Sequence, residues 1–197
     1  KRRAYHVLSC LENVGGELNA YTTKEETCIH ASFLKEYYNK AIELISDVAF
    51  NSVYPENELE KEKEVILDEI NSYLDSPAEE IYDDFENNLY KGHEMGRNIL
   101  GTRELVEGYK RSDLCRFLKN NYSTDRMVIA TIGDIPFEKF KNKIIAHFGD
   151  YKRYDTVYHR TKFTPLPAFN VVHERNSHLS HCIMGGMAYH IDSEKKM

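Results

Sequence analysis

The feature that most constrains the fold is a β-hairpin pattern at residues 17–34, flanked on both sides by segments with helical periodicity. Leu18, Ala20 and Thr22 alternate with polar neighbours, and a polar turn then leads into a second run of β-favouring residues. Alternation with a period of two is typical of a half-buried strand, and two such runs joined by a polar turn indicate a hairpin. The pattern therefore predicts an antiparallel pair of strands.

Helices and further strands are predicted along the rest of the chain. Helical spacing of apolar residues and stop signals predict helices at about 4–14, 37–50, 55–73, 77–90, 112–120 and 137–148. Apolar runs predict strands at 127–132, 169–173 and 182–189. Ser76 and Glu79 match a capping box before one helix. This mixture predicts an α+β fold with a mainly antiparallel sheet and helices packed on one face.

Composition limits the classes of protein to which the chain can belong. A length of 197 residues with 41% hydrophobic residues suffices for one core of ordinary size. The formal net charge of -6 and the lack of a long basic run argue against nucleic-acid binding. No apolar run approaches the ~20 residues that cross a bilayer, so we expect no membrane partner.

The cysteines and the first residue bear on cellular location. The four cysteines lie far apart without a C-x-x-C pair, so they are interpreted as small buried hydrophobes. This usage favours a reducing compartment such as the cytoplasm. The first residue is Lys1 rather than methionine. We therefore expect the chain to begin inside a longer protein, whose true N-terminus and targeting signal lie outside it.

The most informative helix is the predicted one at 55–73, because two acids complete its apolar stripe. Leu59, Ile66 and Tyr73 follow a spacing of three and four residues, and Glu62 and Glu69 fall on the same stripe. Positions seven residues apart are two helical turns apart, so both carboxylates point the same way. A buried carboxylate is costly unless a cation, a hydrogen-bond donor or a metal accompanies it.

An ordinary interpretation of this helix stays open on the pattern alone. The acids can merely edge the stripe and pair with Lys61 or Lys63. Two glutamates on one face do not make a metal site, because catalytic Zn²⁺ takes three protein ligands plus water. His178 and His181 have a metal-like spacing, but their segment is interpreted as a turn and strand, which places them on different faces.

Four blocks of the sequence resemble the pitrilysin/insulinase family of zinc metallopeptidases, and in particular its mitochondrial-processing-peptidase branch. In chain order they are GGELNAYTTKEETCIHASFL, ELEKEKEVILDEI, GHEMGRNILGT and YSTDRMVIATIGDI. The resemblance covers nearly the whole chain. It implies a truncated half-domain of the metalloprotease fold, and it argues against an unrelated α+β interaction module.

The resemblance also implies roles for the residues that match the family's motifs. The family binds zinc through an inverted H-x-x-E-H motif and a downstream glutamate, which corresponds to Glu69 here. Glu62 corresponds to the glutamate that supports the site without ligating the metal. The family's edge strand, which holds the substrate as an added β-strand, corresponds to Asn19, Ala20, Tyr21 and Thr22. The side chain of Asn19 is expected to face the scissile bond.

The chain departs from the family pattern at the catalytic motif. It contains no H-x-x-E-H sequence, and the resemblance implies that this motif lies before Lys1. The general base and two of the three zinc ligands are then missing. We expect zinc in the intact parent protein but none in this fragment, and we expect the fragment to be catalytically inactive.

The resemblance further implies a division of the chain and a function. Residues 1–150 correspond to a truncated N-terminal peptidase domain, 151–166 to a linker, and 167–197 to the opening strands of a second domain. These strands can dock on the vacant edge of the first sheet, within the chain or in a neighbouring one, because unpaired edges favour pairing. The alternative is that they form a loose tail.

The parent is expected to be a zinc endopeptidase that cleaves extended peptides bound as an added β-strand. The alternative is a non-catalytic subunit of the same family that binds peptides or supports an active partner. Glu62 and Glu69 favour the first. The expected partners are peptide substrates and a homo- or hetero-dimer subunit.

Overall fold

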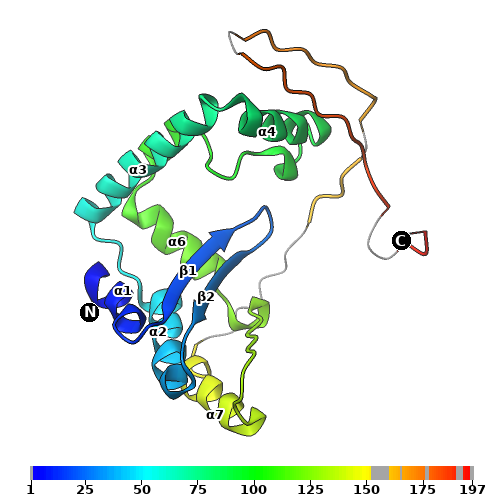
Figure 1. The fold of residues 1–197 in the computed structure, drawn as a ribbon. Helices are drawn as coiled ribbons and strands as arrows, with labels where there is room; N and C mark the ends of the chain where they lie inside the picture. The colour runs from blue at the N-terminus through cyan, green and yellow to red at the C-terminus, as the bar shows by residue number, and fades with distance from the viewer. Residues whose placement is uncertain (1, 152–159, 165, 176–177, 190–192, 196–197) are drawn as a thin grey trace. The chain divides into compact units, whose positions relative to one another are not determined.

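The computed structural model describes residues 2–151, 160–164, 166–175, 178–189 and 193–195 (Figure 1). Its strands are β1 (Glu17–Thr22) and β2 (Thr27–Ser32). Its α-helices are α1 (Ala4–Glu12), α2 (Tyr38–Asn51), α3 (Glu56–Leu74), α4 (Pro77–Leu89), α5 (Arg103–Gly108), α6 (Arg111–Asn121) and α7 (Phe137–Phe148). Short 3₁₀ turns are η1 (Lys35–Tyr37), η2 (Glu94–Gly96) and η3 (Thr124–Arg126). The predicted hairpin and all six predicted helices are confirmed.

The chain forms two compact units that interleave in sequence. The first unit comprises Lys1–Leu59 and Tyr109–Val157, and the second comprises Glu60–Gly108 and Tyr158–Met197. The boundary lies within the first turns of α3. The predicted domain boundaries at residues 150 and 166 divide the chain into consecutive segments, whereas these units are defined by contacts in space. The predicted domains stay a prediction.

The hairpin of the first unit is covered on one face by α1 and α2 (Figure 1). The strands pair antiparallel, from Glu17 opposite Ser32 to Thr22 opposite Thr27. Leu18 and Ala31, which lie opposite each other, pack against a cluster formed by the buried Leu11, Ala41 and Leu44. The prediction of helices packed on one face of an antiparallel sheet is therefore confirmed for this hairpin.

A second cluster joins α2 to α7 in the same unit. Tyr38, Ile42 and Phe148 are buried together, and the Ser46 hydroxyl donates to the carbonyl oxygen of His147 over 2.8 Å. Beyond α7, the ring of Tyr151 stacks on Phe50 with centroids 3.7 Å apart. The C-terminal end of α2 therefore packs against the C-terminal end of α7.

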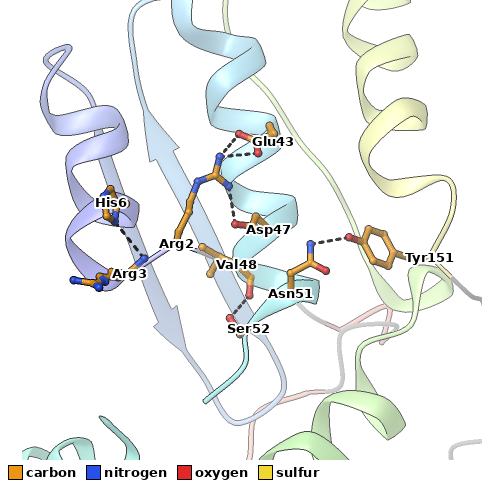
Figure 2. Close-up of polar contacts among 9 residues, drawn as sticks. All are labelled: Arg2, Arg3, His6, Glu43, Asp47, Val48, Asn51, Ser52 and Tyr151. Atoms are coloured by element: carbon orange, nitrogen blue, oxygen red, sulfur yellow. Dashed lines mark hydrogen bonds and ion pairs between the residues drawn. The ribbon is translucent and has the colours of Figure 1, made fainter. Parts of the chain in front are cut away.

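Arg2 fastens the segment before α1 to the side of α2 (Figure 2). Its guanidinium donates to both carboxylate oxygens of Glu43 at 2.7 Å and to Asp47 at 2.6 Å. The two acids lie one helical turn apart, so a single planar donor reaches both. Hydrogen bonds with Glu43 and then Asp47 raise the pKa of Arg2 above its ordinary value.

The predicted strands at 127–132, 169–173 and 182–189 are not formed in the described part of the chain. There the sheet consists of β1 and β2 alone. Val128 is 94% exposed and Ile132 is fully exposed, which shows that no neighbouring strand covers this segment. Local sequence carries the propensity for a strand, but a strand also needs a partner for its backbone hydrogen bonds.

Smaller predictions also meet corrections. Ser76 precedes α4, but its side chain makes no capping hydrogen bond, so the predicted capping box is wrong. Cys10 packs against the first cluster as predicted, whereas Cys182 is exposed. No helix in the described ranges is long and apolar enough to span a membrane.

In the second unit, α4 is contacted by described residues from later in the chain. The guanidinium of Arg175 donates to Glu80 at 2.5 Å, and the ring of Phe169 lies 5.8 Å from that of Phe85. The segment around Phe163 contacts Tyr90 at the end of the helix, with ring centroids 4.9 Å apart. Neither α3 nor α4 contains a fully buried residue.

Candidate functional site

The two glutamates predicted to carry chemistry lie on α3, and both are exposed. Glu62 and Glu69 are two turns apart on this continuous helix, so they share a face as predicted. The prediction that this face points into a core is wrong, because Leu59 and Ile66 are only half-buried and Tyr73 is 38% exposed. Periodicity fixes which side chains share a face of the helix, but a second element must be present to bury that face.

The ordinary interpretation of these acids as partners of Lys63 does not hold. The ammonium of Lys63 instead donates to the carboxylate of Glu60 at 2.9 Å and to the carbonyl oxygen of Glu107 at 3.2 Å. Within the described ranges, the carboxylates of Glu62 and Glu69 make no hydrogen bond or ion pair. Both groups therefore face solvent and are available to a ligand.

The described residues do not by themselves fit a complete zinc site. Among them, no group of three or more histidine, cysteine, aspartate or glutamate side chains could hold a metal ion. His178 and His181 are exposed, and His173 lies 3.7 Å from a carboxylate oxygen of Asp84 instead. A catalytic zinc takes three protein ligands, and Glu69 supplies at most one of them.

Strand β1 presents an open edge of backbone groups. The amide of Thr23 donates to the carbonyl oxygen of Glu26 over 2.8 Å, which continues the ladder past the pair of Thr22 and Thr27. Hydrogen-bonded pairs alternate along an antiparallel ladder. The backbone N–H and C=O groups of Leu18, Ala20 and Thr22 therefore point away from β2. Within the described residues no further strand pairs with that edge.

The predicted substrate-binding residues lie on this edge strand, and their side chains are exposed. Asn19 accepts a hydrogen bond from the backbone amide of Ala20 through Oδ1 at 2.8 Å. The same side chain donates through Nδ2 to the carboxylate of Glu17 at 3.3 Å. Tyr21 lies opposite Cys28 in the register, and a hydrogen bond with this thiol raises the pKa of Tyr21.

A cavity in the second unit was not foreseen from the sequence. It has a volume of about 440 Å³ and is lined by the last turn of α3, by α4 and by residues 96–104. Asp83 on its wall accepts from Asn98 at 2.6 Å, and Arg103 donates to Asn71 at 2.8 Å. The acidic residues within α4 were the only hint of this cavity in the sequence. From the helical pattern alone they are interpreted as an ordinary solvent-exposed face.

Two family models match the chain. Residues 1–103 match the model described as insulinase (peptidase family M16), and residues 109–194 match the model described as peptidase M16 inactive domain. Together the matches span both compact units.

Curated relatives are about a third identical to this chain over the residues that align. The uncharacterized zinc protease YmxG of Bacillus subtilis is 34% identical over 151 residues, which cover 77% of this chain and 37% of the relative. The probable mitochondrial-processing peptidase subunit beta of Schizosaccharomyces pombe is 37% identical over 139 residues, covering 70% of this chain and 30% of the relative. The chain thus spans about a third of the length of these relatives.

Solved structures share the fold at lower identity. A protease from Helicobacter pylori aligns with a TM-score of 0.71 and 22% identity, covering 78% of this chain and 38% of that one. A peptidase M16 inactive domain from Pseudomonas fluorescens aligns with a TM-score of 0.74 and 14% identity, covering 83% of this chain and 40% of that one.

Proposed function

The chain belongs to the insulinase family of peptidases, M16, and from this premise we propose that it is part of a zinc-dependent endopeptidase that cleaves extended peptides. Relatives named zinc protease or mitochondrial-processing peptidase support this activity for the whole protein. This chain contributes the strand that holds the peptide and one carboxylate of the metal site.

The observation that carries the proposal is the open edge of β1. The outward N–H and C=O groups of Leu18, Ala20 and Thr22 can bond the backbone of a peptide that adds as a further strand. Main-chain bonds of this kind give affinity with little demand on the peptide's side chains. The proposed substrate class is therefore unfolded or extended polypeptide.

The metal site of the whole protein takes Glu69 as a ligand and Glu62 as a supporting carboxylate. Their shared helix face and the lack of partners for either carboxylate within the described ranges support this role. The remaining ligands come from residues other than the described ones, since no complete metal group occurs among these. The chain by itself is accordingly proposed to bind no catalytic zinc with useful affinity and to hydrolyse nothing.

A second candidate is a non-catalytic subunit that binds peptides and works with an active partner. It rests on the match of residues 109–194 to a model described as peptidase M16 inactive domain. Relatives named as a subunit support a partner in either candidate. Both candidates use the same edge of β1. A homo- or hetero-dimer partner is part of both proposals.

Peptide binding tests the shared part of the two candidates. A short fluorescein-labelled peptide of alternating valine and serine is titrated with the chain, and fluorescence anisotropy is recorded. We expect saturable binding, and no binding of the same peptide N-methylated at alternate residues, because N-methylation removes the donors of a strand ladder. Equal binding of both peptides, or of neither, would contradict edge-strand recognition.

Zinc titration by calorimetry tests the proposed division of the metal site. We expect no tight one-to-one binding by the chain, by Glu69→Ala or by the control Glu64→Ala, which changes another exposed acid of α3. Tight binding that is lost only in Glu69→Ala would show that residues of this chain complete a site. The proposal of an inactive chain would then fail.

A further inference from the structure

We infer that the side chain of Asn19 is a removable cap on the peptide-binding edge of β1. Its Oδ1 atom accepts the Ala20 N–H at 2.8 Å, the hydrogen bond that an incoming peptide needs. The inference rests on the proposed function, because it assigns a regulating residue to the same edge.

The capped amide occupies the central position of the edge. Three backbone amides of β1 point away from β2, those of Leu18, Ala20 and Thr22, and Ala20 is the middle one. A peptide that pairs along the strand cannot avoid this position without breaking its ladder. It must therefore offer a carbonyl oxygen that displaces the carboxamide of Asn19.

Glu17 holds the cap in this orientation. Residues 17 and 19 lie on the same face of the strand, and the Nδ2 group of Asn19 donates to Glu17 Oε1 at 3.3 Å. The opposite orientation of the carboxamide would set two donors, Nδ2 and the Ala20 N–H, against each other. The chemistry of the two neighbours therefore fixes which atom of Asn19 faces the amide.

The cap has a consequence for both free and peptide-bound chain. In the free chain it satisfies a donor that would otherwise make the edge a template for unwanted strand pairing. On binding, rotation of an exposed side chain suffices to uncover the amide, and no backbone rearrangement is required. Peptide affinity is thus set partly by competition with a residue of the edge itself.

The test combines amide hydrogen exchange with the peptide titration above. In the ¹⁵N-labelled chain we expect Asn19→Ala to speed exchange at Ala20 severalfold while Leu18 and Thr22 keep their rates. Because a hydrogen bond that is exchanged with water contributes about 0.5–1 kcal/mol, peptide binding should tighten about two- to fivefold. Asn19→Asp retains an oxygen acceptor and should retain the protection of Ala20.

Ser32→Ala is the matched control, because Ser32 lies on the same face of the hairpin but on the other strand. It should change neither the exchange rate of the Ala20 amide nor the affinity for the peptide. Unchanged exchange at Ala20 in Asn19→Ala, or weaker peptide binding by this variant, would overturn the cap. If no variant binds the peptide, the proposed function fails, and exchange at Ala20 still decides whether Asn19 occupies its amide.

Discussion

Arg2 is the residue whose electrostatic contacts hold together two segments far apart in the sequence. Its guanidinium bridges Glu43 and Asp47, and about a third of each side chain of the Arg2–Asp47 pair is exposed. Exposed ion pairs contribute little, but a guanidinium held by two carboxylates is at the upper end of this range. We expect Arg2→Met to lower the free energy of unfolding by about 1 kcal/mol, measured by urea denaturation.

The control for Arg2 is Lys40→Met, which removes an exposed cation from α2 and should leave stability nearly unchanged. A double-mutant cycle with Glu43→Gln isolates the coupling between the two side chains. Because the pKa of Arg2 is raised in the folded chain, its contribution is complete below the ordinary arginine value and is lost only as pH rises through the folded value. The coupling should therefore stay constant over the neutral range.

Tyr21 offers a pH-dependent readout of the hairpin. Its hydrogen bond with Cys28 raises the pKa of the phenol, so the neutral form persists to higher pH in the folded chain. Removing the thiol with Cys28→Ala should return the pKa toward the ordinary value of about 10. NMR titration of ¹³C-labelled tyrosine measures it, and an unchanged pKa in this variant would show that the thiol is not the cause. The contribution of this pair is present below the ordinary value and is lost as pH rises through the folded value.

At the scale of elements, Gly16 joins α1 to β1 at a place where no side chain fits. A Cβ atom at this position would lie 2.8 Å from the carbonyl oxygen of Ser32 and 3.3 Å from the Cβ of Leu11. The first neighbour is backbone and cannot rotate away. We expect Gly16→Ala to destabilise the chain by about 1–3 kcal/mol in urea denaturation, the usual cost of overpacking.

Gly108 provides the matched comparison for Gly16. It lies at the end of α5 with open space around an added Cβ, and alanine favours helices more than glycine does. Gly108→Ala should therefore leave stability unchanged or raise it slightly. Equal destabilisation by both substitutions would mean that the close approach of Gly16 to Ser32 is not what limits the junction.

Elements set by local pattern were predictable from the sequence, and those set by distant neighbours were not. The hairpin at Leu18–Ala31 and the helix around Glu62 and Glu69 follow from period and turn chemistry. The prediction that the helix face of those two glutamates is buried was wrong, because burial depends on which other element covers the helix. Helix α5 was missed because six residues are too few to show a period. Asn19–Thr22 lie in β1, one of the two strands of the described sheet, and their role in binding stays a proposal.

At the scale of the whole molecule, the compact units depend on contacts that sequence order hides. Residues 60–108 separate the two parts of the first unit, and the segment around Arg175 returns to α4 within the second. A prediction from sequence order places domain boundaries at linkers, whereas the observed units are defined by contacts between residues far apart in the sequence. The family resemblance, in contrast, was accessible from four short blocks, since motif order survives without knowledge of those contacts.

The exposed segment at 127–132 predicts how whole chains behave toward one another. Val128 and Ile132 present apolar side chains to solvent on a segment outside any helix, and this segment pairs with no strand in the described ranges. Unpaired backbone groups beside exposed apolar side chains form a surface that strands of another chain can join. Sedimentation velocity over a range of concentrations should therefore show a mass that rises above 23.0 kDa.

The double variant Val128→Lys with Ile132→Lys should remain at the monomer mass, because like charges on neighbouring strands repel and the apolar surface is removed. Ile145→Lys is the control, since Ile145 is similarly apolar and exposed but lies on α7, where the backbone groups are already paired within the helix. This control should associate like the parent chain. If Ile145→Lys abolished association and the double variant did not, the contact would be a helical face, and strand pairing through 127–132 would be excluded.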